Sequence, residues 1–559
     1  MREIVGVGVG RGAVTGPVAR AHPAPHLPVD LPVPDDLPAA VERVEAAFAE
    51  VASTLQARAD VATGTLGTVL GATAAMARDR TMCRQVVSRV QECTAPSVAV
   101  HQVVDQFVEM FRAAGGYMAD RATDLLSVRD RVVALLEGLP EPGVPALERP
   151  SVVVAEDLSP ADTAALDLTK VLAIVIEQGG PTGHTAIIAG QLGLPCIVRA
   201  TAAASLVDGE DVAVDAARGI ITVAPDSAVR SAVDARRASL ASLAENTADG
   251  ATSDGHGVQL LANIGTAQDA ERLVGASVQG VGLFRTEVLF LDATTAPTED
   301  EQSAVYARAL TALGDRKVVV RTLDAGADKP LAFVTQPGEE NPALGVRGYR
   351  LVRTAPQLLQ TQLAAIARAA VDTGGDPWVM APMITTADEA RDFAALARGA
   401  GIARVGVMIE VPAVALRAHE VLAEVDFVSI GTNDLAQYTM ATDRLRGELL
   451  DLLDMWQPAV LDLVATVARA GTDAGKPVGV CGESAADPVM ALVLAGMGIT
   501  SLSMAPAAIP SVRFALGAHS MTTCRAVAAA ARSARSAAAA YRAALSLVEP
   551  EVREVLALT

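Results

Sequence analysis

A single histidine stands in a glycine-rich segment, GGPTGHTAIIAG at residues 179–190. Neutral imidazole is nucleophilic toward phosphorus, and the phosphohistidine that it forms is itself a phosphoryl donor. The residues that follow, TAIIAGQLG, predict a helix, and the N–H groups at a helix N-terminus attract negative charge. His184 is therefore a candidate phosphoryl acceptor, and the alternative is a histidine that caps or lines a turn.

Eight apolar runs between residues 257 and 506 each end in polar side chains. They are VQLLANI, GVGLFRTE, KVVVRTLDAG, PWVMAPMI, RVGVMIEVP, DFVSIGTND, PVGVCGES and ITSLSMAP. Near-continuous apolar runs are typical of strands buried on both faces. Eight of them, separated by helical segments, predict a (β/α)₈ barrel with its reactive side chains at the carboxyl ends of the strands. The side chains at those ends are Asn263, Arg285, Arg321, Met383, Glu410, Asn433 with Asp434, Cys481 and Ser503.

Arg285 and Arg321 end two neighbouring runs. The guanidinium group presents a planar fork of donors that matches phosphate or carboxylate, so the pair predicts a dianionic ligand. The alternative is that both arginines form surface ion pairs. Lys329, Arg347 and Arg350 could add positive charge to the same region, but their positions leave this open.

Glu410 and Asp434 end the fifth and sixth runs, about one β–α–β unit apart. Carboxylates without a His or Cys cluster favour Mg²⁺ or Mn²⁺ over zinc, and the alternative is a structural ion-pair network. Asn433 could donate to a phosphoryl oxygen. Cys481 is either a packed thiol, as buried cysteines usually are, or a proton carrier. Together these residues predict a metal-assisted site for a small phosphorylated carboxylic acid.

The elements that must position these residues predict a multidomain α/β protein, because 559 residues exceed one ordinary core. Residues 1–20 and 145–225 alternate short apolar runs with helical patterns and predict a small β/α domain. Residues 21–144 carry apolar residues at i, i+3 and i+4 and predict an all-helical insert. Residues 226–250 predict a linker helix, and residues 251–559 form the predicted barrel.

Composition excludes several classes of function. The net charge is −20, and the lysines are Lys170, Lys317, Lys329 and Lys476, which argues against a nucleic-acid partner. No stretch of about 20 uncharged apolar residues and no signal-peptide pattern is present, so we expect no membrane insertion. The five cysteines have no metal-binding spacing and are typical of reduced thiols in the cytoplasm.

Over essentially its full length the sequence resembles the enzyme I family of the bacterial phosphoenolpyruvate:sugar phosphotransferase system. The motifs that carry the resemblance are GGPTGHTAI, VGLFRTE, VVRTLDAGADK, MIEVPA, SIGTNDLAQYTMATDR and VCGESA. The resemblance implies that phosphoenolpyruvate, bound with Mg²⁺ in the barrel, phosphorylates a histidine on a swivelling β/α domain. The phosphoryl group then passes to the phosphocarrier protein HPr, the first step of sugar uptake. The helical insert would dock HPr, and the barrel would form a homodimer.

The resemblance also implies a role for each matching residue. His184 would accept the phosphoryl group at Nε2, and Cys481 would donate the proton that turns enolpyruvate into pyruvate. Glu410 and Asp434 would ligate Mg²⁺, with Mn²⁺ as a substitute. The residues that would bind phosphoenolpyruvate are Arg285, Arg321, Asn433 and Arg444. Two further residues would support these groups, Thr163 by holding the Nδ1 of His184, and Lys329.

Three residues near His184 depart from the family pattern. Gly183 replaces the usual Ser, Gly190 stands where a basic residue is common, and Arg199 replaces a usual Gly. We expect these changes to affect phosphohistidine stability, with Arg199 as a replacement cation if its side chain folds toward His184. The pattern of residues 119–132 in the insert also departs, which bears on the affinity for HPr.

Two alternative functions remain. One is an enzyme of the pyruvate-phosphate dikinase and phosphoenolpyruvate synthase group without its ATP-binding domain, although the insert has no Gly-rich nucleotide loop. The other is a diverged regulatory paralogue that senses phosphoenolpyruvate without turnover.

Overall fold

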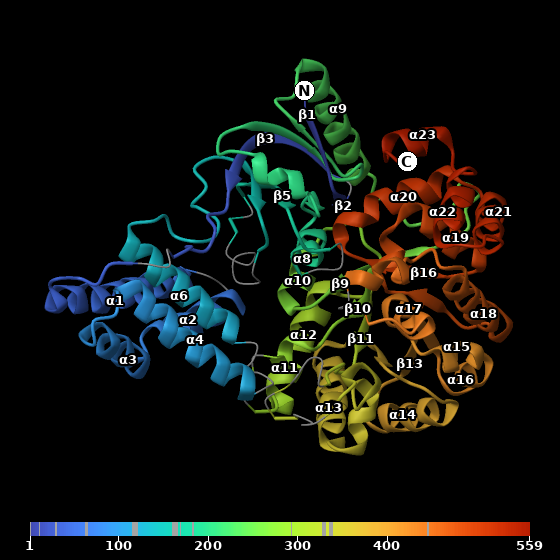
Figure 1. The fold of residues 1–559 in the computed structure, drawn as a ribbon. Helices are drawn as coiled ribbons and strands as arrows, with labels where there is room; N and C mark the ends of the chain where they lie inside the picture. The colour runs from blue at the N-terminus through green and yellow to red at the C-terminus, as the bar shows by residue number, and fades with distance from the viewer. Residues whose placement is uncertain are drawn as a thin grey trace. The chain divides into compact units, whose positions relative to one another are not determined.

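The computed structural model describes residues 2–10, 12–27, 31–61, 65–114, 121–158, 166–167, 169–180, 184–291, 293, 295–326, 331, 333–334, 339–443 and 447–558. The chain divides into two compact units (Figure 1). One comprises Met1–Gly190 with Leu194–Asp234, and the other comprises Gln191–Gly193 with Ala235–Thr559.

The first unit contains an eight-stranded mixed sheet in the order β1-β8-β7-β3-β4-β5-β6-β2. Its strands are β1 Arg2–Val5, β2 Val7–Val9, β3 Ala13–Arg20, β4 Ser151–Ala155, β5 Val171–Ile176, β6 Cys196–Val198, β7 Asp211–Asp215 and β8 Ile220–Val223. The run β3-β4-β5-β6 is parallel and the remaining pairs are antiparallel. The first strands of the chain thus join the predicted small β/α domain.

The sheet is apolar on both faces. Along β4, Val152 and Val154 belong to one buried cluster, whereas Val153 and Ala155 belong to another. Successive side chains of a strand point to opposite faces, so a strand buried on both sides needs apolar residues at every position. This explains the uninterrupted run SVVVA.

Between β3 and β4 the chain forms the helices of the predicted insert. They are α1 Leu37–Val61, α2 Thr65–Ala77, α3 Arg80–Gln91, α4 Pro96–Ala114 and α6 Ala122–Glu137. Apolar residues at helical spacing bury one stripe of each helix, as Val86 and Val90 do on α3. The Asp79 side chain caps α3 by accepting a hydrogen bond from the Met82 N–H.

The second unit is a closed barrel of eight parallel strands, which confirms the predicted (β/α)₈ fold. The strands are β9 Gln259–Ile264, β10 Gly280–Phe284, β11 Lys317–Arg321, β12 Trp378–Ala381, β13 Arg404–Ile409, β14 Phe427–Ile430, β15 Val478–Val480 and β16 Ser501–Met504. All eight predicted apolar runs form these strands. Their order around the barrel follows the chain, with β16 closing onto β9.

Helices alternate with these strands and surround the barrel. They are α10 Ala267–Arg272, α11 Val288–Leu291, α12 Glu299–Leu313, α13 Pro356–Thr373, α14 Ala387–Gly399, α15 Pro412–Leu416, α16 Ala418–Glu424, α17 Thr432–Met440, α18 Pro458–Ala474 and α19 Pro488–Met497. The chain ends in α20 Ile509–Ala518, α21 Met521–Arg532, α22 Ala537–Leu545 and α23 Pro550–Val555. Two further helices precede the barrel in the chain, α8 His184–Leu192 and α9 Ser227–Ala244.

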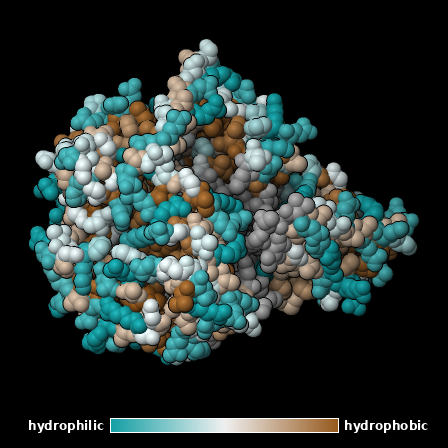
Figure 2. All heavy atoms as spheres, turned by 180° about the vertical axis from the view of Figure 1, so that it is seen from behind, coloured by the Kyte–Doolittle hydropathy of each residue, from teal (hydrophilic) through white to brown (hydrophobic). Residues whose placement is uncertain are grey.

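The molecular surface matches the composition. Seen from behind, hydrophilic side chains cover much of the visible face (Figure 2), in keeping with the net charge of −20. Among the described residues, no helix has both the length and the apolar character that a membrane span requires.

Two helical glycines of the barrel unit should respond in opposite ways to alanine. A Cβ on Gly496 in α19 would lie 2.1 Å from the Cys524 carbonyl oxygen of α21, whereas a Cβ on Gly517 in α20 meets nothing within 4 Å. Gly496→Ala should therefore lower the free energy of unfolding by about 1–3 kcal/mol. Gly517→Ala should raise it by no more than about 1 kcal/mol. Urea denaturation followed by circular dichroism measures both, and a Gly496→Ala protein as stable as the parent would contradict this close helix packing.

Candidate active site at the carboxyl end of the barrel

The carboxyl ends of parallel strands in a closed barrel open at one mouth. Arg321 is the last residue of β11, while Arg285, Glu410 and Cys481 directly follow β10, β13 and β15. Asn433 and Asp434 lie in the first turn of α17, just beyond β14. The structure therefore brings these six sequence-predicted residues to the same end of the barrel.

Arg321 is buried, with 6% of its surface exposed, and lies between two carboxylates. It forms ion pairs with Glu287 and, at 3.2 Å, with Asp324. Burial by itself lowers the pKa of Arg321, but these carboxylates and Glu410 raise it overall, so the guanidinium stays charged. Its Nε has no hydrogen-bond partner among the described atoms, so a donor remains for a bound anion.

Neighbouring polar side chains hold the strand end that carries Arg321. The Thr286 hydroxyl donates to the Arg321 carbonyl oxygen at 3.0 Å. Gln362, on α13, donates to the Thr286 hydroxyl at 3.1 Å and to the Tyr306 hydroxyl at 2.9 Å. Its amide oxygen accepts from the Leu323 N–H at 2.9 Å. Because these buried groups satisfy one another, the backbone at this strand end is held in place.

Arg347, which the sequence left undecided, joins two carboxylates at the centre of the site. It is 1% exposed and donates to Asp324 at 3.0 and 3.2 Å and to Asp434 at 3.2 Å. A continuous row of alternating charges results, and its members in order are Glu287, Arg321, Asp324, Arg347 and Asp434. We call this the charge row.

Glu410 is a buried carboxylate beside the charge row, with 1% of its surface exposed. Its Oε1 accepts a hydrogen bond from the Met383 N–H at 2.6 Å, and Met383 has a left-handed backbone with φ of 59°. Burial, together with repulsion from Asp434 and Asp324, raises the pKa of Glu410 to about 8. Burial and these neighbouring carboxylates therefore disfavour the charged form of Glu410.

The donor set suits a divalent cation that shares its ligands with a substrate. No group of three or more His, Cys, Asp or Glu side chains arranged to hold a metal occurs among the described residues. Mg²⁺, however, is usually held by one or two carboxylates together with substrate phosphates and waters. Glu410 and Asp434 fit this pattern, and a cation there would relieve the repulsion that raises the pKa of Glu410.

A further cation, Arg285, and a thiol, Cys481, also lie at this end of the barrel. Arg285 forms no ion pair within the part of the chain that the structure describes, and burial together with the nearby Arg321 lowers its pKa. A bound anion would stabilise this cation. The Cys481 thiol is 3% exposed and lies 3.6 Å from the Ile430 carbonyl oxygen. Burial raises the pKa of Cys481, so the group is a protonated thiol at neutral pH.

Amide side chains link the remaining strand ends. Asn263 donates to the Cys481 carbonyl oxygen at 3.3 Å and accepts from the Ser503 hydroxyl at 2.6 Å. The Asn433 side-chain oxygen accepts from the Glu483 N–H at 3.2 Å. These bonds tie the loops after β14 and β15 and the ends of β9 and β16 to one another.

Glu287 and Asp324 were not recognised as site residues from the sequence. Each lies three positions after the last residue of a barrel strand, within LFRTE and RTLDAG. The criterion that selected Glu410, a carboxylate just after an apolar run, would have found both.

His184 is the first residue of α8, as the sequence predicted. Nearby, Arg199 has a left-handed backbone with φ of 56°, and its Nε donates to the Gly179 carbonyl oxygen at 3.2 Å. Arg199 thus contacts the glycine-rich segment that leads to His184. Thr163, Gly183, Lys329 and Arg444, together with the His184 side chain, lie outside the described residues.

Three family models match most of the chain. The family described as "PEP-utilising enzyme, N-terminal" matches residues 5–121, "PEP-utilising enzyme, mobile domain" matches residues 147–219, and "PEP-utilising enzyme, PEP-binding domain" matches residues 240–521. The last match contains the whole candidate site.

Full-length relatives are also similar. A phosphoenolpyruvate-protein phosphotransferase of Streptomyces coelicolor is 46% identical over 98% of this chain and 99% of its own. A protein of the same name from Haloferax volcanii is 41% identical over 75% of this chain and 76% of its own. Another, from Enterococcus faecalis, is 36% identical over 86% of this chain and 88% of its own.

The pKa of Glu410 predicts how stability depends on pH. The pKa of this carboxyl is about 8 in the folded chain and about 4.3 in the unfolded chain. At any pH between these two values, the folded state binds more protons than the unfolded state. Its stabilising contribution is therefore full below pH of about 4 and is lost as pH rises through about 8, by at most about 1.4 kcal/mol per pH unit. We expect metal-free protein to become less stable between pH 6 and 9, as measured by urea denaturation with EDTA present.

Two variants separate Glu410 from other causes. Glu410→Gln should remove the contribution of Glu410 to the pH dependence of the unfolding free energy. Glu420→Gln, at an exposed position of α16, should leave that pH dependence unchanged. An unchanged slope in Glu410→Gln would show that another group titrates.

Proposed function

The chain belongs to the phosphoenolpyruvate-protein phosphotransferase family, and on that premise we propose how its residues divide the transfer of a phosphoryl group from phosphoenolpyruvate to protein. Phosphoenolpyruvate binds at the carboxyl end of the barrel, and His184 accepts its phosphoryl group at Nε2. The observation that carries this proposal is the convergence of Arg285, Arg321, Glu410, Asp434 and Cys481 at one mouth.

Arg285 and Arg321 bind the phosphoryl and carboxylate groups of phosphoenolpyruvate, with Asn433 and Arg444 as further ligands. The open Nε of Arg321 supports this role, since a buried donor without a partner is costly unless a ligand satisfies it. Because its carboxylate neighbours hold Arg321 in place, the guanidinium is oriented before the substrate arrives, as electrostatic catalysis requires. We assign Lys329 a supporting role for these ligands.

Glu410 and Asp434 hold Mg²⁺, which Mn²⁺ can replace. When bound, the cation neutralises negative charge on the substrate's carboxylate and phosphoryl oxygens. The raised pKa of Glu410 supports the assignment, because burial and the nearby Asp434 and Asp324 disfavour its charged form and a bound cation would offset both effects.

Cys481 supplies the proton that completes the reaction. As the phosphoryl group moves to His184, the bond between phosphorus and the enol oxygen breaks and leaves enolpyruvate. The thiol then donates its proton to the enol carbon, which gives pyruvate, and the thiolate recovers a proton from solvent. A buried thiol with a raised pKa supports this role, because the proton is present at neutral pH.

The phosphorylated His184 passes its phosphoryl group to HPr, which docks on the helical insert, in the first step of sugar uptake. Thr163 holds Nδ1 of His184 so that Nε2 faces the phosphorus. Since one histidine must serve both the barrel and HPr, the small β/α domain of residues 1–20 and 145–225 swivels between them. The protein acts in the cytoplasm as a homodimer joined through its barrel domain.

Labelling tests the acceptor. ³²P-phosphoenolpyruvate with Mg²⁺ and no ATP should give an acid-labile label on the parent chain and none on His184→Ala. His419→Ala, at an exposed histidine of α16, should label as the parent does. Label that persists in His184→Ala would exclude the acceptor role, and a requirement for ATP would point to a dikinase.

Deuterium uptake tests the proton donor. In D₂O, Cys481→Ala should still phosphorylate His184, whereas stereospecific deuterium incorporation into pyruvate should fall by about 10²-fold or more. Cys524→Ala, at an equally buried cysteine of α21, is the matched control and should incorporate deuterium normally. Unchanged stereospecific incorporation in Cys481→Ala would make Cys481 a packed thiol without a chemical role.

A further inference from the structure

Serine hydroxyls lie inside the barrel on the strands next to Cys481. Ser429 on β14 and Ser501 and Ser503 on β16 are all buried, with 6%, 6% and 3% of their surfaces exposed. Ser429 lies opposite Gly479 in the β14–β15 pair, and Cys481 lies two positions beyond Gly479. Because side chains two positions apart share one face of a sheet, Ser429 and Cys481 face the same side.

The Ser429 hydroxyl is a proton donor next to the Cys481 sulfur. Burial raises the pKa of Cys481, and a hydrogen bond with the Ser429 side chain opposes this increase. A hydroxyl lowers the pKa of a thiol when it donates to the thiolate. The Ile430 carbonyl oxygen, 3.6 Å from the sulfur, can only accept a hydrogen bond and therefore cannot return a proton.

A water-sized cavity of about 10 Å³ lies within the barrel, and all three serines line it. The Ser503 hydroxyl donates to the Asn263 side-chain oxygen at 2.6 Å. The Ser501 hydroxyl has no hydrogen-bond partner within the part of the chain that the structure describes. A Cβ added to Gly479 would lie 2.7 Å from the Ser501 Oγ and 3.7 Å from the Ser429 Oγ. A cavity of this size holds about one water, and a buried hydroxyl without a protein partner normally bonds to water.

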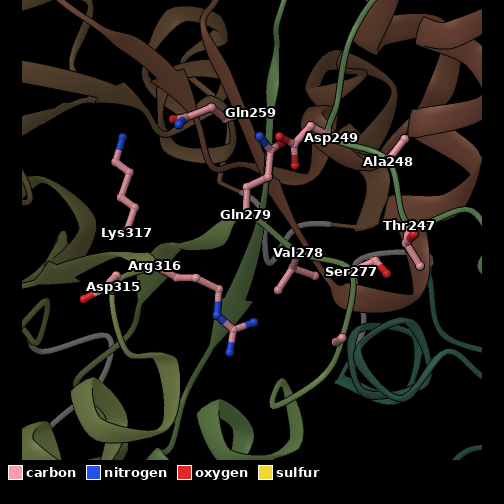
Figure 3. Close-up of a pocket in the computed structure, with 11 residues that line it drawn as sticks. Thr247, Ala248, Asp249, Gln259, Ser277, Val278, Gln279, Asp315, Arg316 and Lys317 are labelled. Carbon is pink, nitrogen blue, oxygen red and sulfur yellow. The ribbon is translucent and has the colours of Figure 1, made fainter.

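This small cavity lies toward the amino end of the barrel. Lys317, Phe427 and Ser501, the first residues of β11, β14 and β16, line it. Lys317 also lines a larger cavity of about 600 Å³ at the amino end, together with Gln259 (Figure 3). Gln259 is exposed and pairs with Ser501 across the neighbouring strands. The hydroxyls thus extend from Cys481 toward the end of the barrel opposite the candidate active site.

We propose that Ser429 and Ser501 form a proton path through the barrel interior that returns a proton to the Cys481 thiolate after each turnover. This inference rests on the proposed role of Cys481 as proton donor. The Ser429 hydroxyl gives its proton to the thiolate and takes one from a water in the small cavity. That water takes a proton from the Ser501 hydroxyl, which recovers its own from solvent in the amino-end cavity. Only S–H and O–H bonds change, and one proton enters from solvent for each proton that pyruvate gains.

The path would serve a thiol that solvent at the mouth reaches poorly. Cys481 is 3% exposed, and its substrate binds at the same end of the barrel under the proposed function. A route from the amino end lets the thiolate recover its proton before the product has left the mouth.

Comparison of the first turnover with later turnovers tests the path. Rapid-quench measurements on the full-length protein use excess phosphoenolpyruvate with Mg²⁺ and HPr and follow pyruvate. In Ser429→Ala and in Ser501→Ala the first turnover should proceed at the parent rate, because the thiol begins with its proton. The steady-state rate should fall at least about tenfold, and its solvent deuterium isotope effect should rise. A serine with a purely structural role would slow both phases alike.

A buried serine outside the barrel interior supplies the control. Ser511→Ala, on α20, should match the parent in both phases. A parent-like steady-state rate in either interior variant, or equal slowing of the first and later turnovers, would overturn the proton path alone. Normal stereospecific deuterium incorporation by Cys481→Ala would overturn the donor role and the path together, so the two failures are distinguishable.

Discussion

The charge row of Glu287, Arg321, Asp324, Arg347 and Asp434 constrains the whole carboxyl end of the barrel. Removing charges from water costs several kcal/mol per ion, and only close pairing offsets that cost. Each arginine of the row therefore needs a carboxylate on both sides, and the one inner carboxylate, Asp324, needs two arginines. The members come from the end of β11, the loops after β10 and β11, the segment that carries Arg347, and α17. Their pairing therefore holds these segments in one arrangement.

The charge row leaves both signs of charge incompletely compensated at the mouth. Burial together with the neighbouring Arg321 lowers the pKa of Arg285, whereas burial together with Asp434 and Asp324 raises the pKa of Glu410. An anion bound by the arginines and a cation bound by the carboxylates would each relieve one imbalance. A phosphorylated carboxylic acid with a divalent cation supplies both charges, so the proposed substrate complements the electrostatics of the site.

Backbone geometry contributes to the same site. Met383 adopts a left-handed conformation, which is unfavourable for a side chain with a Cβ, and its N–H meets the Glu410 carboxylate. A Cβ added to Gly431 would lie 2.9 Å from the other oxygen of Glu410. The carboxylate is thus held between a strained backbone donor and a residue that must remain small, which limits the orientations it can take.

The sequence by itself determined the barrel and the positions of its polar strand ends. Eight apolar runs of strand length, separated by helices, commonly form a closed barrel of parallel strands. In such a barrel the carboxyl ends of all strands lie at one mouth. The sequence alone could therefore place four residues at this mouth, namely Arg285, Arg321, Glu410 and Cys481.

Which cation pairs with which carboxylate was decided only by the tertiary structure. Arg347 lies in a segment without strand or α-helix periodicity, and its contacts with Asp324 and Asp434 follow only from the tertiary structure. The raised pKa of Glu410 likewise arises from burial and from carboxylates distant in the sequence, and neither is a local property of the chain.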